Sequence, residues 1–337
     1  MEFHFHRLHP LIRIGTASDR YAGWLGQIYS EERYKGRITR RHKVLRDSSL
    51  IEEVLPVDSV EEYFEHFPVL EIDFTFYRPL LDQNGKPTQK YQVLQKYLSY
   101  LKEDDHLLLK VPQAVMAPKL RHGGGYRENP AYLDPEVFTN QFFNPATELL
   151  GRHLQGFIFE QEYLRKEDRD PVKGVADSLD AFFRKLPEDK RYHLEIRTDL
   201  YLRDTLFAVL EKHGVGQVFS HWTWLPPLRK QLAKAGGNFF NSGGQCVIRL
   251  LTPLRMRYED TYLQAYPFDR LVEDMVQPEM ILDTVDLLWQ AVNRGVLVNL
   301  IINNRAGGNA PLMAEMVADK FRKRIEPVTP KGQLRLW

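Results

Sequence analysis

The chain has 337 residues, of which 43% are hydrophobic and 27% are charged, the proportions of a soluble globular protein. Its formal net charge of +1 provides no general attraction for nucleic acid or for an anionic membrane. A single cysteine, Cys246, excludes an internal disulfide framework and any cysteine-only metal site within one chain. No stretch has the apolar length of a membrane span, so we expect a cytoplasmic protein without membrane contact.

Strand-like and helix-like segments alternate along the chain. Short apolar runs predict eight strands, at 11–17, 69–77, 107–111, 156–161, 192–197, 217–220, 245–250 and 296–302. Apolar residues at helical spacing predict helices at 91–101, 175–186, 202–213, 227–235, 280–294 and 311–324. Glycines at 214 and 295 follow two of these helices, as is typical of a helix end.

This alternation predicts an α/β fold with a parallel sheet and right-handed crossovers, and eight such units can close into a (β/α)8 TIM-type barrel. We expect one domain with a core at about 11–324, and insertions at about 30–60 and 113–145. An open doubly wound sheet is the alternative fold. A dinucleotide-binding version is disfavoured, because the first strand is followed by G-T-A-S-D-R-Y-A-G rather than by GxGxxG.

Polar side chains gather at the predicted strand ends. The segment V-L-E-I-D-F-T-F-Y-R-P at 69–79 alternates strictly, which places its two acids and one threonine on one face of a strand. The polar residues at or near all the strand ends are Glu71, Asp73, Thr75, Lys110, Gln161, Glu195, Arg197, His221, Arg249, Asn303 and Asn304. Because buried charges need partners, these groups form either a structural ion-pair network or a cavity for a polar or anionic ligand. We favour the cavity.

Several of these residues have predicted roles. Glu71 or Asp73 can share acid and base roles with Glu195, and His221 can transfer protons. The predicted substrate-binding residues are Trp24, Tyr77, Lys110, Gln161, Arg197, Arg249, Asn303, Asn304, Gly307 and Gly308. Motifs for nucleophilic, nucleotide-cleaving or zinc chemistry are absent from the sequence, so we predict no metal and no cofactor.

The segment I-I-N-N-R-A-G-G-N-A-P at 301–311 joins the last strand to a helix. Barrel enzymes often bind phosphate at this position, so we predict an anion pocket made of Arg249, Asn304 and the amides of 306–309. In the alternative interpretation, the glycines form a tight turn and the asparagines cap neighbouring backbone. At 122–126, H-G-G-G-Y is interpreted as a flexible turn rather than as an anion-binding nest.

These motifs resemble those of the YecE-like family, also called domain of unknown function 72. The resemblance extends from about residue 11 to about 324. It rests on G-T at 15–16 with Trp24 and Ile28-Tyr29, V-L-E-I-D-F-T-F-Y-R-P, K-V-P at 110–112, Gln161, E-I-R at 195–197, I-R-L at 248–250, and N-N-R-A-G-G-N-A-P at 303–311. It implies a (β/α)8-type barrel with a polar groove at the strand ends, and leaves the biochemical role open.

The chain departs from the family pattern at several positions. Asp73 replaces the usual asparagine and Phe74 the usual serine. Leu251-Thr252 stands where the family commonly has His-Gly, and the usual Thr-His after the third strand is not recognisable, with His122 as a substitute. These differences imply a divergent or impaired member if the family is catalytic.

Three functions remain open. The first is an enzyme, a hydrolase or lyase, that acts on a phosphorylated or sugar-like anionic small molecule. The second is a nucleic-acid-processing barrel of endonuclease-like architecture, for which the Arg/Lys-rich stretch 33–46 and the aromatic residues near the strand ends would hold a strand; the balanced net charge does not favour it. The third is a non-catalytic binding or scaffold protein. The sequence leaves the substrate, the reaction and the oligomeric state open.

Overall fold

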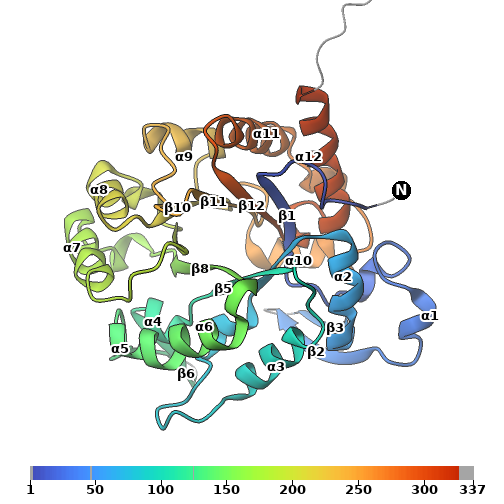
Figure 1. The fold of residues 1–337 in the computed structure, drawn as a ribbon, viewed down its shortest axis with the longest axis horizontal. Coiled ribbons are helices and arrows are strands. Elements are labelled where there is room, and N and C mark those ends of the chain that lie inside the picture. Colours follow the sequence, from blue (N-terminus) through green and yellow to red (C-terminus); the bar gives the residue numbers. More distant parts are fainter. Residues whose placement is uncertain (1–2, 46–47, 124, 326–337) are drawn as a thin grey trace, which may run out of the picture.

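Eight parallel strands close into a barrel in the computed structural model, which describes residues 3–45, 48–123 and 125–325 (Figure 1). Their order around the barrel is β1-β12-β11-β10-β9-β8-β5-β4. Each barrel strand therefore pairs with the barrel strands that precede and follow it in the chain, and the last pairs with the first. The strands are β1 Ile12–Ala17, β4 Val69–Ile72, β5 His106–Lys110, β8 Leu154–Gln161, β9 Tyr192–Ile196, β10 Gly216–His221, β11 Gln245–Leu250 and β12 Leu297–Ile302. The predicted TIM-type barrel is therefore confirmed, and the open sheet is wrong, because β12 pairs with β1 from Ile12↔Val298 onwards.

A ring of helices covers the outside of the barrel (Figure 1). The longer ones are α2 Val60–His66, α3 Gln89–Leu98, α6 Asn144–Leu150, α7 Val172–Phe183, α8 Asp204–His213, α9 Leu228–Lys234, α10 Tyr258–Ala265, α11 Pro278–Val292 and α12 Ala310–Ile325. Three short helices, α1 Glu31–Tyr34, α4 Gln113–Met116 and α5 Pro135–Phe138, lie in the insertions. Gly214 ends α8 at φ 63°, a left-handed conformation that glycine adopts without strain. Within the described ranges, no helix has the length and apolar character needed to cross a bilayer.

The barrel interior is arranged in layers. Because side chains alternate along a strand, every second residue points inward. One inward layer is apolar and consists of Ala17, Val69, Leu108, Ile158, Val218, Val247 and Ile301. The residues two positions further along most of these strands are Glu71, Lys110, Glu160, Ser220, Arg249 and Asn303. This layer, at the carboxyl ends of the strands, is polar and forms what we call the barrel mouth.

The second predicted strand is shorter than expected. β4 ends at Ile72, and Phe74–Tyr77 forms a 3₁₀ helix. Thr75 folds back, and its hydroxyl donates to the carbonyls of Ile72 (3.1 Å) and Lys110 (2.8 Å). The predicted face that Glu71 shares with Asp73 and Thr75 is therefore wrong beyond Glu71. In the sequence, the alternation of polar and apolar residues continues past Ile72. In the structure these residues form a turn, because side-chain hydrogen bonds to the backbone replace strand pairing there.

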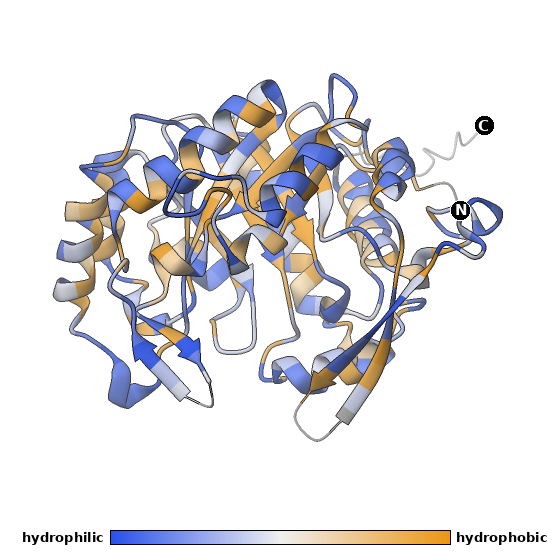
Figure 2. Cartoon of the chain, turned by 90° about the horizontal axis from the view of Figure 1, so that it is seen from below, coloured by the Kyte–Doolittle hydropathy of each residue, from blue (hydrophilic) through white to orange (hydrophobic). Residues whose placement is uncertain are grey.

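Each predicted insertion contains a β-hairpin. β2 Thr39–Leu45 pairs with β3 Ser48–Val54, and β6 Lys119–His122 pairs with β7 Gly125–Glu128. The two hairpins extend on the same side of the barrel (Figure 2), and they follow the carboxyl ends of β1 and β5. The predicted turn at 122–126 lies between the paired strands β6 and β7, and its Gly124 lies outside the described residues, as does residue 46 of the basic stretch 33–46.

Candidate functional site

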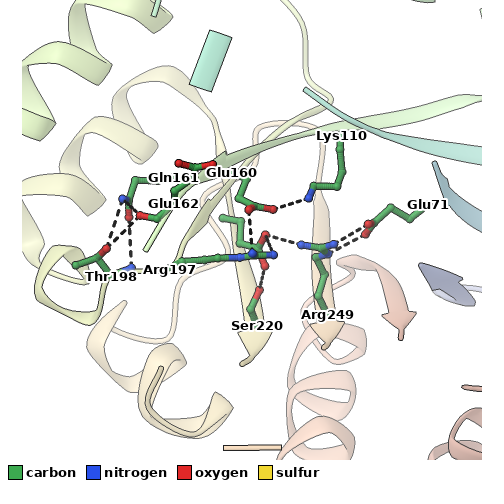
Figure 3. Close-up of polar contacts among 10 residues, drawn as sticks. Glu71, Lys110, Glu160, Gln161, Glu162, Arg197, Thr198, Ser220 and Arg249 are labelled. Atoms are coloured by element: carbon green, nitrogen blue, oxygen red, sulfur yellow. Dashed lines mark hydrogen bonds and ion pairs between the residues drawn. The ribbon is translucent and has the colours of Figure 1, made fainter. Parts of the chain in front are cut away.

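Six charged side chains form one continuous network at the barrel mouth. Arg249 lies between Glu71 on one side and the cluster containing Glu160 and Arg197 on the other (Figure 3). Its Nε and Nη2 donate to the two carboxylate oxygens of Glu71, at 2.8 and 2.6 Å, in a forked arrangement. Its Nη1 donates to Oε2 of Glu195. One guanidinium thus joins β4, β9 and β11.

The other half of this network connects β5, β8 and β9. Arg197 contacts Oε2 of Glu195 at 3.2 Å and Oε1 of Glu160 at 2.8 Å. Lys110 forms an ion pair with Oε2 of Glu160 at 2.5 Å. The hydroxyl of Ser220 donates to Oε1 of Glu195 at 2.5 Å. We call this set the mouth network; it consists of Glu71, Lys110, Glu160, Glu195, Arg197 and Arg249.

The mouth network balances its own charge with three acids and three bases. Five of the six are almost fully buried, and the side chain of Arg197 is 17% exposed. Burial alone would raise the pKa of Glu160, but Arg197, Lys110 and Arg249 lower it to about 2. Complete burial raises the pKa of Glu71, and the Arg249 guanidinium opposes that rise. These groups pair with one another, as the ion-pair alternative describes. The catalytic roles of Glu71 and Glu195 stay predictions.

Two members of this site were not predicted from sequence. Glu160 and Ser220 point inward, each two residues after an inward apolar residue. The two-residue period from Ile158 would have selected Glu160, whereas the sequence analysis chose its neighbour Gln161. Gln161 joins two loops instead, because its side chain contacts the backbone amide (3.3 Å) and the hydroxyl (3.4 Å) of Thr198.

His221 does not reach the mouth network. It follows Phe219 on the outward face of β10, where Phe219 packs in the core between barrel and helices. Its Nδ1 contacts the carbonyl of Thr252 at 2.9 Å, and burial lowers its pKa to about 4. This environment favours a neutral ring with a structural contact, and its predicted role in proton transfer stays a prediction.

The loop 303–311 uses its polar groups internally. Asn304 accepts hydrogen bonds from the indole of Trp24 (3.1 Å) and from the amide of Ala310 (2.8 Å). The amides of Ala306, Gly307 and Gly308 donate to the carbonyls of Asn303 and Asn304. The side-chain oxygen of Asn303 accepts hydrogen bonds from the backbone amide and from Nε of Arg305, both at 3.0 Å. The predicted anion pocket therefore lacks free amides at 306–308, and Arg249, its predicted cation, is already paired.

The two glycines of this loop are required by close packing within the protein. A Cβ on Gly307 would lie 2.3 Å from Sδ of Met313, and one on Gly308 would lie 2.4 Å from the carbonyl oxygen of Arg270. Gly308 also has φ 102°, a conformation that other residues rarely adopt. These contacts explain the glycines without a ligand.

A cleft of about 600 Å³ opens beside the mouth network, between hairpin β2–β3 and the segments that follow β1 and β4. The cleft reaches the edge of the barrel mouth at Glu71 and Asp73, and residues of α3 line another of its walls. Its charged lining residues are Asp19, Arg20, Arg41, Lys43, Glu52, Glu53, Glu71, Asp73 and Lys90. Its aromatic lining residues are Tyr21, Phe74, Tyr77 and Tyr97. Of the predicted site residues, this cleft includes Glu71, Asp73 and Tyr77.

Some charges that line the cleft have no charged partner. Lys43 forms an ion pair with Glu52 at 3.3 Å. Three other charged lining residues, Arg41, Asp73 and Lys90, have no ion pair within 4.0 Å among the described residues. Burial lowers the pKa of Lys90, and the charge of Asp73 opposes this shift. Unpaired charges around a cavity are available to a ligand.

Metal binding has no structural support in the described ranges, where no group of three or more His, Cys, Asp or Glu side chains is placed to hold an ion. The carboxylates of the mouth network pair with arginine and lysine.

Comparison with known protein families matches residues 13–334 to the protein of unknown function DUF72 family. The chain belongs to the DUF72 family. Two solved structures of this family resemble the DUF72 protein described above. One, from Thermotoga maritima MSB8, is 13% identical, with a TM-score of 0.54 over 94% of this chain and 100% of the other. The second, from Enterococcus faecalis V583, is 14% identical, with a TM-score of 0.55 over 92% and 95%. No curated protein matched this DUF72 chain. At these identities the structural likeness supports the fold alone.

Proposed function

We propose that this DUF72 protein binds a small anionic molecule, phosphorylated or sugar-like, in the cleft beside the mouth network. The unpaired cations Arg41 and Lys90 carry this proposal. They come from the hairpin β2–β3 and from α3 and line the same cleft, so an occupant of the cleft can contact both. Cationic side chains that converge on a cavity are typical of sites for phosphate and carboxylate groups.

The charge remaining in the cleft after internal pairing supports an anion. Glu71 is neutralised by Arg249, Glu52 by Lys43, and Glu53 contacts Arg40 at 3.0 Å. The lining charges that remain are Arg20, Arg41, Lys90, Asp73 and Asp19. Three cations and two carboxyl groups leave this set net positive near neutral pH, even when Asp19 is ionised.

The cleft is favoured over the loop 303–311 as the anion site, because three of the loop amides already donate within the protein. The aromatic ring of Tyr77, which is 61% exposed, lies on the same cleft wall and offers a face for a sugar ring. In this proposal the mouth network has a structural role beside the cleft. It fixes the position of Glu71 and of the turn that begins at Asp73.

Calorimetric titration with inorganic phosphate tests this proposal. We expect Arg41→Ala and Lys90→Ala each to weaken phosphate binding about tenfold, since each removes one charge-assisted contact worth about 1.5 kcal/mol. Arg152→Ala is the matched control: Arg152 pairs with Glu103 at 2.6 Å and precedes β8, at the opposite end of the barrel. Equal binding by all three variants, or a loss in Arg152→Ala alone, would contradict the proposal.

A second candidate function, binding of a single nucleic-acid strand, is supported by the exposed rings of Tyr163 and Trp224. These rings are 38% and 44% exposed, and their centroids lie 6.1 Å apart on loops that follow β8 and β10. Arg169 lies 5.8 Å from the Tyr163 ring. Exposed aromatic faces beside arginine are typical stacking platforms for bases.

Fluorescence anisotropy with a labelled single-stranded oligonucleotide tests this second candidate. If it is correct, we expect binding that weakens steeply with salt and that loses about 1–3 kcal/mol in Trp224→Ala. Leu200→Ala is a control at another exposed apolar side chain. Binding that is equal in wild type and Trp224→Ala would leave the small-ligand function as the supported one.

A further inference from the structure

One buried carboxyl group lines the cleft, and one of its two oxygens has no hydrogen-bond partner. Asp19 is 2% exposed and belongs to the cleft lining. Its Oδ1 accepts the hydroxyl of Tyr97 at 2.8 Å, whereas its Oδ2 is buried without a hydrogen-bond partner. A buried polar atom of this kind costs free energy unless a ligand or a proton satisfies it.

The backbone holds Asp19 in this position under strain. Ser18, the preceding residue, has φ 68° although it is not glycine. Its amide donates to the carbonyl of Glu71 at 3.1 Å, and its carbonyl accepts the hydroxyl of Thr16 at 2.7 Å. The hydroxyl of Tyr29 fixes the Asp19 carbonyl at 2.6 Å. A strained residue that its surroundings fix so completely is characteristic of functional sites.

The surroundings of Asp19 favour the protonated form. Burial raises its pKa to about 6; the Tyr97 hydrogen bond and the charge of Arg20 oppose the rise, and the charge of Asp73 adds to it. Asp19 interacts electrostatically with five titratable or charged groups, namely Arg20, Tyr29, Tyr63, Asp73 and Tyr97. None of these provides an ion pair within 4.0 Å in the described structure.

We propose that Asp19 is the proton-donating residue of the cleft, whose carboxylic acid binds an oxygen of the anionic ligand through Oδ2. This inference rests on the proposed function, and it adds a residue that recognises the ligand by donating a hydrogen bond from its O–H group to a ligand oxygen. With a pKa of about 6, Asp19 is largely protonated at pH 5 and largely ionised at pH 7. In its protonated form, a carboxylic acid can donate such a bond. The ionised form would instead repel an oxyanion.

Asp19 and Asp73 line the same cleft, and the charge of Asp73 acts on Asp19, which suits Asp19 to the acid role in a hydrolytic step. The Oδ2–H bond of Asp19 breaks as its proton passes to the leaving oxygen of the ligand, while a water molecule attacks the atom that loses this oxygen. The Asp73 carboxylate, which lines the same cleft without an ion pair, takes the proton released by the water. Proton exchange with solvent then restores both groups. Two carboxyl groups in different environments are suited to such separate roles.

Sulfate is the probe for this proposal, because its charge stays constant between pH 5 and pH 8. In wild-type protein we expect sulfate affinity to fall about tenfold from pH 5 to pH 7, since only the protonated fraction of Asp19 can donate a hydrogen bond to the anion. In Asp19→Asn the affinity should not change in this range, because the amide donates at every pH. Asp104→Asn, at an exposed position, should titrate like the wild type.

The outcomes separate this inference from the proposed function. If Arg41→Ala abolishes sulfate binding while wild type and Asp19→Asn show the same pH profile, the cleft binds anions and the role of Asp19 is wrong. If wild-type protein binds no sulfate, the proposed function fails. The protonation of Asp19 is then still read by infrared spectroscopy of the ligand-free protein. A carboxylic-acid band with a midpoint near pH 6 that is lost in Asp19→Asn supports the acid, and its absence from wild type overturns it.

Discussion

Arg249 connects two carboxylates that are distant in sequence, and its contacts show how single residues build this site. The guanidinium is 3% exposed and contacts Glu71 through two hydrogen bonds and Glu195 through a third. A buried charge of this kind adds little net stability when its partners are present, but it is costly to leave one partner alone. The mouth network is therefore sensitive to loss of any one member.

Arg249→Met tests this dependence. The substitution leaves Glu71 and Glu195 buried without their shared cation, so we expect the free energy of unfolding to fall by about 3–5 kcal/mol. Urea denaturation measures this loss. Arg152→Met, which breaks an exposed pair with Glu103, should cost only about 0–1 kcal/mol. Similar losses in the two variants would show that the mouth network is not the buried, interdependent set described above.

At the scale of elements, strand alternation predicted the inward face of the barrel better than it predicted the strand ends. The pattern that begins at Val69 continues to Phe76, yet the strand stops at Ile72. The following turn is fixed by Thr75, whose hydroxyl bonds across to the carbonyl of Lys110 on β5. A bond of this kind, between the turn after one strand and the neighbouring strand, is not visible in a single run of residues.

The loop before α12 provides a test at this scale. Asn304→Ala removes the acceptor for both the buried indole of Trp24 and the amide of Ala310. We expect a loss of about 2–4 kcal/mol in the free energy of unfolding, because two buried donors are left unsatisfied. Thermal and urea unfolding measure it, with Asn293→Ala, an exposed position after α11, as the control. If Asn304 served only a ligand, its replacement would leave stability unchanged.

At the scale of the whole molecule, barrel closure brings distant residues to one mouth, and the insertions add a second wall beside it. The eight apolar runs, together with the family resemblance, predicted the barrel because each run supplies one buried strand. The two hairpins were not predicted, since their strands are largely exposed and lack an apolar alternation that would indicate them. The cleft depends on hairpin β2–β3, so it could not be predicted without that hairpin.

The candidate site was predicted in part for the same reason. Lys110, Glu195, Arg197 and Arg249 lie at strand ends in the sequence and meet in the mouth network. Glu160 was missed by one residue, because the inward phase of a continuous apolar strand is not marked in its own sequence. Asp19 was missed because it follows its strand in an irregular turn.

Local residue patterns were enough to predict the eight strands and the chemical types at their ends, because strand periodicity and strand order can be read along the chain. The three-dimensional arrangement sets which of those groups neutralise one another and which remain unpaired in a cavity. Pairing depends on distances between strands and loops that are far apart in the chain, and burial depends on what covers each group. Pairing and burial therefore distinguish the mouth network around Arg249, whose charges are paired, from the cleft lined by Asp19, Arg41 and Lys90.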